Sequence, residues 1–286
     1  MPPAASGILS RMPVDVPGLR AASLARARDR PRGPEPASVS DLILPDTPGV
    51  RARRYRPTVD EPRPLLVYLH GGMWIVGGLE SHDRLCRQIA AATDVEVLAV
   101  AYRLAPEHRY PAAVDDALAA VRWVAERTDA PAIGIGGDSA GGCVAALAAL
   151  APRDEAEPLL SALIMFCPNT DLTADVAGPE IVAGAHLWAP TAAARRAASP
   201  LLAPDLSGLP PTVLLTAEHD DLRPEGDALA ARLADAGVPV THRVEPGTEH
   251  GFVMSDGPAT DRALADVARV LAPGSGSLPT SRRRPQ

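Results

Sequence analysis

A ten-residue segment changes from strand to helix character and carries Gly-x-Ser-x-Gly at the junction. It reads Ile133-Gly134-Ile135-Gly136-Gly137-Asp138-Ser139-Ala140-Gly141-Gly142 and leads into an alanine-rich run. A serine on so sharp a turn has a strained backbone and projects its hydroxyl above the end of the sheet, as in a nucleophile elbow. Gly137 and Gly141 have no Cβ, so the strand and the helix can approach each other there. An ordinary glycine-rich turn or a phosphate cradle would also fit the motif alone, but the flanking strand and helix favour the elbow.

The rest of the chain alternates between apolar strands and helices. Strands are expected at Val39–Leu44, Val50–Arg56, Leu65–Leu69, Val95–Val100, Ala132–Gly136, Ser161–Phe166, Thr212–Thr216 and Val240–Val244, and helices at Leu19–Arg28, Pro111–Arg127, Ser139–Leu150, Pro224–Ala236 and Pro258–Leu271. The first two strands read as an antiparallel hairpin, and most later strands carry no polar face, which indicates a parallel sheet covered on both sides. We therefore expect an α/β fold with a central, mostly parallel sheet and helices on both faces.

One catalytic domain over residues 38–272 accounts for this pattern, because no internal repeat or interdomain linker interrupts it. Residues 1–37 are rich in proline, alanine and arginine, and we expect a cap or flexible segment there. Residues 172–199 form an irregular, cap-like insertion after a strand, where open α/β sheets bind ligands. The tail 273–286 contains Arg282-Arg283-Arg284 among glycine, serine and proline, and is expected to be disordered rather than a binding patch.

The composition narrows the function classes. A net charge of −7 argues against nucleic-acid binding by the whole domain. No apolar run approaches the roughly 18 residues that span a bilayer, and the N-terminus lacks the character of a secretory signal. Cys86, Cys143 and Cys167 are widely spaced among mostly apolar neighbours and indicate buried side chains, not disulfides or a metal site. A cytoplasmic location is the expectation.

A serine hydroxyl becomes nucleophilic when a base removes its proton and a carboxylate orients that base. In the order Ser, Asp, His, each partner should follow a strand. Glu218, Asp220 and Asp221 follow the strand at 212–216, and the pattern Asp-x-Leu-Arg favours Asp220, with Asp221 as runner-up. His250 follows the strand at 240–244, in a turn bounded by glycines. The predicted catalytic residues are thus Ser139, Asp220 and His250.

The tetrahedral intermediate of acyl transfer needs backbone N–H donors aimed at its oxyanion. One should come from Ala140, the residue after the nucleophile. The others should come from the loop His70-Gly71-Gly72-Met73-Trp74, which follows the strand at 65–69. A simple turn is the alternative for this loop, but its pairing with the elbow favours an oxyanion hole made by Gly71, Gly72, Met73 and Ala140, with Gly71 assisting the turn.

Taken together, these motifs resemble the hormone-sensitive-lipase-like serine esterases, especially their bacterial branch, over roughly Val50 to Leu271. The matching segments are His70-Gly71-Gly72, Tyr102-Arg103-Leu104-Ala105-Pro106-Glu107, Gly137-Asp138-Ser139-Ala140-Gly141-Gly142, Asp220-Asp221-Leu222-Arg223 and His250-Gly251-Phe252. The resemblance implies an α/β-hydrolase fold with a small, reduced cap, no metal or organic cofactor, and hydrolysis of carboxylic esters through an acyl-serine.

The chain departs from the family pattern where substrates would enter. Met73 replaces the third glycine of the oxyanion motif, and its side chain is expected to point toward the acyl pocket, where it would either narrow the pocket or shift the loop. Met73, Trp74, His186 and Trp188 are the candidate pocket residues, although a cap helix packing on the domain would explain His186-Leu187-Trp188 equally well. Arg103 and Glu107 are expected to be structural partners in a buried turn, and His70 a hydrogen-bonding support for its loop.

The leading hypothesis is an esterase that cleaves small or short-chain acyl esters. The same residues could run amide hydrolysis or acyl transfer, because an acyl-serine can be released to any nucleophile that reaches it. A binding protein on the same fold is the third alternative, and an intact Ser, Asp and His set argues against it. The expected partner is a small-molecule ester, and the sequence leaves a homodimer open.

Overall fold

The computed structural model describes residues 14–45, 47–151, 160–174 and 177–272. Within these residues eight strands form one sheet in the order β1-β2-β4-β3-β5-β6-β7-β8. The strands are β1 Ser38–Ile43, β2 Arg51–Arg56, β3 Leu65–Leu69, β4 Glu96–Ala101, β5 Ile133–Asp138, β6 Ala162–Phe166, β7 Thr212–His219 and β8 Val240–Glu249. The pairs β1–β2 and β2–β4 are antiparallel and the others are parallel. This confirms the predicted mostly parallel sheet with an antiparallel start.

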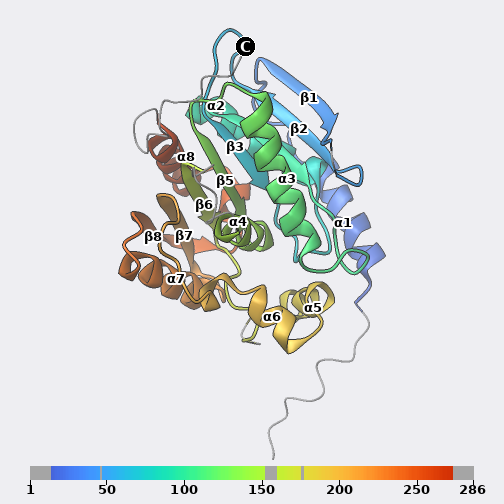
Figure 1. Cartoon of the computed structure of the whole chain (residues 1–286). Coiled ribbons are helices and arrows are strands. Elements are labelled where there is room, and N and C mark those ends of the chain that lie inside the picture. Colours follow the sequence, from blue (N-terminus) through green and yellow to red (C-terminus); the bar gives the residue numbers. More distant parts are fainter. Residues whose placement is uncertain (1–13, 46, 152–159, 175–176, 273–286) are drawn as a thin grey trace, which may run out of the picture.

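Helices cover both faces of the sheet (Figure 1). One face carries α2 (Leu79–Thr93) and α8 (Pro258–Leu271), and the other carries α3 (Ala112–Arg127), α4 (Ala140–Leu150) and α7 (Arg223–Asp235). Side chains of a strand alternate between faces. In β3, Leu66 and Tyr68 join the core beneath α2 and α8, whereas Leu65, Val67 and Leu69 join the other core. Two apolar layers thus hold the strand ends, and the loops that follow them, in fixed positions.

Helix α2 is absent from the sequence prediction. It begins after Gly78, whose N–H donates to Ser81 Oγ at 3.0 Å. Its buried side chains recur at helical spacing and include Leu85, Cys86 and Ile89. Most charged residues of the segment are not buried, so it has the pattern of an amphipathic helix, which the sequence prediction did not include.

Three helices surround the carboxyl end of the sheet: α1 (Val16–Asp29), α5 (Pro179–Trp188) and α6 (Ala192–Ala197). Figure 1 shows α5 and α6 (yellow) beneath α4, with α1 (blue) to one side. The insertion at 172–199 is therefore largely helical, which corrects the expectation of an irregular stretch. Alanine, which dominates it, is the strongest helix former but supplies little apolar periodicity. Residues 1–13 and the tail 273–286 lie outside the described residues.

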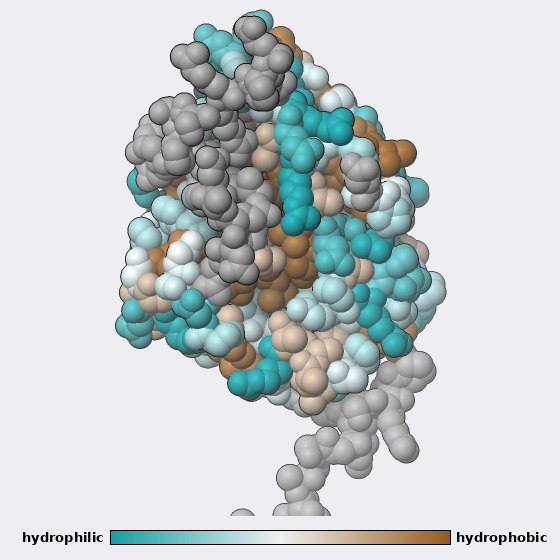
Figure 2. All heavy atoms as spheres, viewed as in Figure 1, coloured by the Kyte–Doolittle hydropathy of each residue, from teal (hydrophilic) through white to brown (hydrophobic). Residues whose placement is uncertain are grey.

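Most large apolar side chains of the described residues are buried. Among the described residues, the large hydrophobic side chains that are exposed are Leu24, Ile43 and Val59. Figure 2 shows teal and white residues over much of one face, with brown residues gathered near its centre. In the described part of the chain no helix has both the length and the apolar character needed to cross a membrane.

Candidate active site

Ser139 stands at the turn between β5 and α4. Its φ of 52° and ψ of −120° lie in a region that residues with a side chain rarely occupy. The turn is tight against β3: a Cβ on Gly141 would lie 2.0 Å from the Leu69 carbonyl oxygen, and one on Gly137 would lie 2.2 Å from it. Both positions therefore require glycine, and the elbow holds the serine at the carboxyl edge of the sheet.

A chain of hydrogen bonds runs from Ser139 to Asp220. His250 follows β8, and its Nε2 lies 3.0 Å from Ser139 Oγ. Its Nδ1 lies 2.8 Å from Asp220 Oδ2, and the Leu222 N–H donates to Asp220 Oδ1 at 2.9 Å. Glu218, a competing acid, instead accepts from the Gly247 N–H at 2.6 Å. The structure thus brings together the three side chains that the sequence singled out, although 111 residues separate the serine from the histidine.

The ionisation of the pair suits a base that is oriented by a carboxylate. Burial raises the pKa of Asp220, but the hydrogen bond and charge of His250 and the hydrogen bonds from Leu222 and Cys167 together outweigh burial. The pKa therefore lies below its usual 3.8. Burial lowers the pKa of His250, but the hydrogen bond to Asp220 and the charges of Asp220 and Asp138 together outweigh burial. The pKa therefore lies above its usual 6.5. The pair therefore favours a charged carboxylate and strengthens the imidazole as a proton acceptor.

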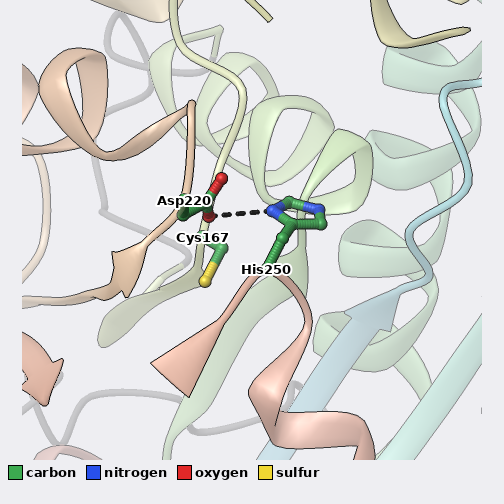
Figure 3. A group of neighbouring side chains, drawn as sticks. All are labelled: Cys167, Asp220 and His250. Atoms are coloured by element: carbon green, nitrogen blue, oxygen red, sulfur yellow. Dashed lines mark hydrogen bonds and ion pairs between the residues drawn. The ribbon is translucent and has the colours of Figure 1, made fainter. Parts of the chain in front are cut away.

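Cys167 completes the buried end of this chain (Figure 3). Its Sγ and ligand-type atoms of Asp220 and His250 all lie within 4.8 Å of one another, so the three could offer atoms to a metal ion. The dashed line in Figure 3 is the hydrogen bond between Asp220 and His250, and burial raises the pKa of the Cys167 thiol, so the thiol stays protonated. As a hydrogen-bond donor, the protonated thiol helps to lower the pKa of Asp220.

The loop before α2 offers backbone donors near the serine. Met73 and Trp74 have φ of 54° and 59°, and a Cβ on Gly72 would lie 2.3 Å from the Val76 carbonyl oxygen. No described residue accepts a hydrogen bond from the N–H groups of Gly72, Met73 or Ala140. These three groups are available to a developing oxyanion.

Gly71 differs from the other predicted oxyanion residues. Its N–H donates to Asp138 Oδ1 at 3.0 Å, so it cannot serve as an oxyanion donor. A Cβ on Gly71 would also lie 2.3 Å from Asp138 Oδ2. This corrects its inclusion among the donors and leaves it the supporting part in the turn.

Asp138 is a functional residue that the sequence reasoning missed, although it lies inside the elbow motif. It is buried and also accepts from the Tyr68 hydroxyl at 2.8 Å, while its Oδ2 lies 3.2 Å from His82 Nε2. Burial raises its pKa, but His82 and these hydrogen bonds outweigh burial and lower it to about 2. A fixed negative charge thus ties the elbow to the oxyanion loop. Its partner His82 lies on α2, the helix that was not predicted, and so the pair could not be expected from the sequence.

Asn169 is a second missed neighbour of the serine. Its Oδ1 lies 3.3 Å from Ser139 Oγ, so two acceptors face one hydroxyl. The loop that carries Asn169 is anchored by the buried Glu225, which accepts from the Thr170 N–H at 2.7 Å. Burial raises the pKa of Glu225 to about 7. Nothing in the sequence around Asn169 distinguishes it from an ordinary loop residue.

Ser139 and His250 open into a cavity of about 290 Å³. Its apolar wall is formed by Met73, Val76, Ile181 and Met254.

The other candidate pocket residues lie elsewhere. Trp74 and Trp188 are fully buried and stack on each other, with ring centroids 4.7 Å apart, and neither lines the cavity. His186 lines a separate, smaller hollow beside Glu225. Of the four candidates, Met73 alone borders the cavity next to Ser139, and the placement of the other three corrects the prediction. Stacking of the cap residue Trp188 on the loop residue Trp74 buries both rings, which is more favourable than exposing them to solvent in the cavity.

In the turn at 102–107, Arg103 and Glu107 each form an ion pair with a residue outside the turn. Arg103 pairs with Asp116 at 2.8 Å, whereas Glu107 pairs with Arg20 of α1 at 2.7 Å. His70 is buried, and its Nδ1 lies 2.9 Å from the Gly71 carbonyl oxygen. Burial lowers the pKa of His70 to about 4, so it is neutral and supports its loop.

Comparison with known proteins gives a consistent result. A family described as having the alpha/beta hydrolase fold matches residues 66–254. The carboxylesterase NlhH of Mycobacterium tuberculosis is 35% identical over 308 residues, covering 92% of this chain and 94% of its own. An ethyl acetate hydrolase of Pseudomonas putida is 38% identical and covers 77% of both chains. Two solved structures share the architecture. An esterase of Pyrobaculum calidifontis has a TM-score of 0.80 and 34% identity, and the match covers 92% of this chain and 95% of the other. The thermostable carboxylesterase EstE1 from a metagenomic library has a TM-score of 0.83 and 33% identity, and the match covers 91% of this chain and 99% of the other.

Proposed function

We propose a catalytic assignment on the premise that this chain belongs to the alpha/beta hydrolase fold family and, within it, to the hormone-sensitive-lipase-like esterases. It is a serine hydrolase of the carboxylesterase type. Ser139 is the proposed nucleophile, His250 the general base and acid, and Asp220 the carboxylate that orients the imidazole. The unbroken hydrogen-bond chain from Ser139 Oγ through His250 to Asp220 carries this proposal.

In the first half-reaction Ser139 Oγ attacks the ester carbonyl carbon and passes its proton to His250 Nε2. The carbonyl oxygen takes the negative charge, which the N–H groups of Gly72, Met73 and Ala140 stabilise. When the intermediate collapses, the protonated imidazole gives its proton to the leaving alcohol and an acyl-serine remains. Water then attacks the acyl-serine with His250 as base, and the acid is released with the serine restored. Asp220 stabilises the imidazolium in both steps.

The substrate is proposed to have a small or short-chain acyl group. The cavity of about 290 Å³ lies at the low end for small-molecule sites. Met73 lines it at the position proposed for an oxyanion donor, where a side chain larger than that of glycine would leave less room for the acyl group. A relative named for ethyl acetate hydrolysis supports the same reading.

The Ser139→Ala variant tests the assignment. It should retain its fold by circular dichroism and lose about 10⁴-fold or more of its kcat on p-nitrophenyl acetate, because the acyl-serine cannot form. It should also lose labelling by a fluorophosphonate probe. Ser40→Ala, a change to an exposed serine on the edge strand β1, is the matched control and should behave as the wild type. Wild-type turnover by the Ser139 variant would overturn the proposal.

Location and assembly are proposals as well. The described cysteines are all free and buried, which fits a reducing compartment such as the cytoplasm. β8 is an edge strand of the sheet, and such an edge can pair with a second copy. Light scattering on the purified protein would decide between a monomer and a homodimer.

A further inference from the structure

The cap helix α1 places two arginines at the active-site cavity. Arg26 and Arg30 line the same cavity as Ser139 and His250. Resting on the proposed ester hydrolysis, we propose that these two arginines bind an anionic group of the substrate, so that the preferred esters carry a carboxylate in addition to the ester bond. The four-residue spacing of the pair places both on one side of the helix end, where they can act on one ligand.

The charge of this segment is opposite to that of the protein. Residues 20–32 contain five arginines and one acidic residue, Asp29, whereas the whole chain has a net charge of −7. A local positive field over a cleft of an otherwise acidic protein attracts anions to that cleft.

Both arginines are available to a ligand. Arg26 and Arg30 are exposed, and neither forms an ion pair with a described acidic residue. The acidic side chain among the described residues that line the cavity is Asp138, and it is buried and bonded to Tyr68, Gly71 and His82. No described carboxylate in the cavity is therefore free to neutralise the arginine pair.

The helix that carries the pair is fixed to the body of the protein. Arg20 Nε donates to the Ile75 carbonyl oxygen at 2.8 Å, and its other nitrogens donate to Ala105 and Glu107 at 2.7 to 2.9 Å. Ile75 belongs to the turn that follows the oxyanion loop. One end of α1 is thus tied to the catalytic loop, so Arg26 and Arg30 lie at a set distance from the serine. A preset position lowers the ordering cost of binding.

The two walls of the cavity define the substrate class. The apolar wall of Met73, Val76, Ile181 and Met254 suits a short hydrocarbon segment, and the arginine pair suits a planar carboxylate. The fitting ligand is a short amphiphile, with an ester at Ser139 and a carboxylate a few carbons away. The monoester of a short dicarboxylic acid and a short-chain ester of a hydroxy acid both have this form.

Matched substrates test the proposal on the full chain. On the acyl side, mono-4-nitrophenyl glutarate is compared with 4-nitrophenyl pentanoate, which has the same number of acyl carbons. On the alcohol side, 4-acetoxybenzoate is compared with its methyl ester. The variant Arg26→Gln/Arg30→Gln is compared with Arg28→Gln/Arg32→Gln, which removes two charges from the same segment at residues that do not line the cavity.

In at least one substrate pair, the Arg26/Arg30 variant should lower kcat/KM for the charged ester by about tenfold, chiefly through KM, and change the neutral ester by less than about twofold. The control variant should leave the charged-to-neutral ratio within about twofold of the wild type, and added salt should reduce the wild-type preference. The pair that responds identifies the acyl or the alcohol side. An unchanged ratio in both pairs, or an equal loss in the control variant, would overturn the arginine proposal. If the arginine proposal fails in this way but Ser139→Ala still loses its turnover of the neutral esters, the proposed function stands.

Discussion

Met73 adopts a left-handed backbone conformation, with φ of 54°, at a position where a glycine would be unstrained. The residue lines the active-site cavity, and no described residue accepts a hydrogen bond from its N–H. A residue of this size at the oxyanion position can therefore affect both the position of a backbone donor and the width of the acyl site.

Replacing Met73 with glycine should widen the acyl site without removing the donor. We expect the kcat/KM of Met73→Gly for p-nitrophenyl hexanoate relative to the acetate to rise by about tenfold, because methylene-sized differences in an apolar site have effects of this order. Met73→Leu keeps the side-chain volume and should retain the wild-type chain-length profile. A profile that is the same in all three proteins would show that Met73 does not limit the acyl chain.

At the residue scale, the sequence was sufficient where the chemistry is encoded locally. Ser139, Asp220 and His250 each follow a strand, and parallel strands place their carboxyl ends at one edge, so their approach follows from order alone. Asp138 and Asn169 were missed because their partners come from distant elements. Trp74, His186 and Trp188 were misplaced because a bulky apolar residue packs inside or lines a pocket according to its neighbours, and the sequence does not show those neighbours.

At the scale of elements, α5 presses against the oxyanion loop. A Cβ on Gly184 would lie 2.6 Å from the Met73 carbonyl oxygen and 2.8 Å from its Cβ. Both distances are shorter than a van der Waals contact, so the backbone of the helix or the loop would have to move. The glycine thus sets the distance between a cap helix and the proposed donors.

The Gly184→Ala variant should lower kcat about 10- to 100-fold, because a displacement of about 1 Å at a catalytic group has this effect. Alanine is otherwise the better helix residue by about 1 kcal/mol, so a loss of activity would not follow from helix propensity. Gly178→Ala is the matched control, since a Cβ there meets nothing within 4 Å and φ is −55°. Steady-state kinetics on p-nitrophenyl acetate measures both, and equal activities would contradict the contact argument.

Elements with strong local patterns were predicted within a few residues. β3 and α8 have the predicted bounds, and the hairpin β1–β2 pairs as expected. The strands β7 and β8 run further than predicted, to His219 and Glu249, because they pair with each other past their apolar parts. α5 and α6 were not predicted, since alanine-rich helices that tertiary packing stabilises have no clear apolar stripe. α2 was also not predicted, although its buried side chains recur at helical spacing.

At the scale of the whole molecule, the stability of the fold is linked to pH through Glu225. Burial raises the pKa of this carboxyl from 4.5 to about 7. A group whose pKa is raised on folding contributes stability that is fully present below the unfolded value and is lost as pH rises through the folded value. The contribution of Glu225 to the free energy of unfolding is therefore full below about pH 4.5 and is lost as the pH rises through about 7.

The Glu225→Gln variant should remove this dependence. Glutamine keeps the carbonyl oxygen that accepts from the Thr170 N–H, and it carries no charge to bury. The difference between the free energies of unfolding at pH 5 and pH 8.5 should become smaller by about 2–3 kcal/mol, from a shift of this size. Urea unfolding at the two pH values measures it. Glu126→Gln, on the exposed face of α3, should leave the difference unchanged, and an equal effect in both variants would contradict the assignment.

The stacked pair of Trp74 and Trp188 gives the protein an optical property. One indole belongs to the oxyanion loop and the other to α5, and the rings are nearly parallel, at 6°, with centroids 4.7 Å apart. Indoles this close couple their electronic transitions, and the chain holds one further tryptophan, Trp123. Circular dichroism in the aromatic region and tryptophan emission therefore report directly on whether the cap touches the loop. A change in this contact during turnover would therefore be visible without an attached dye.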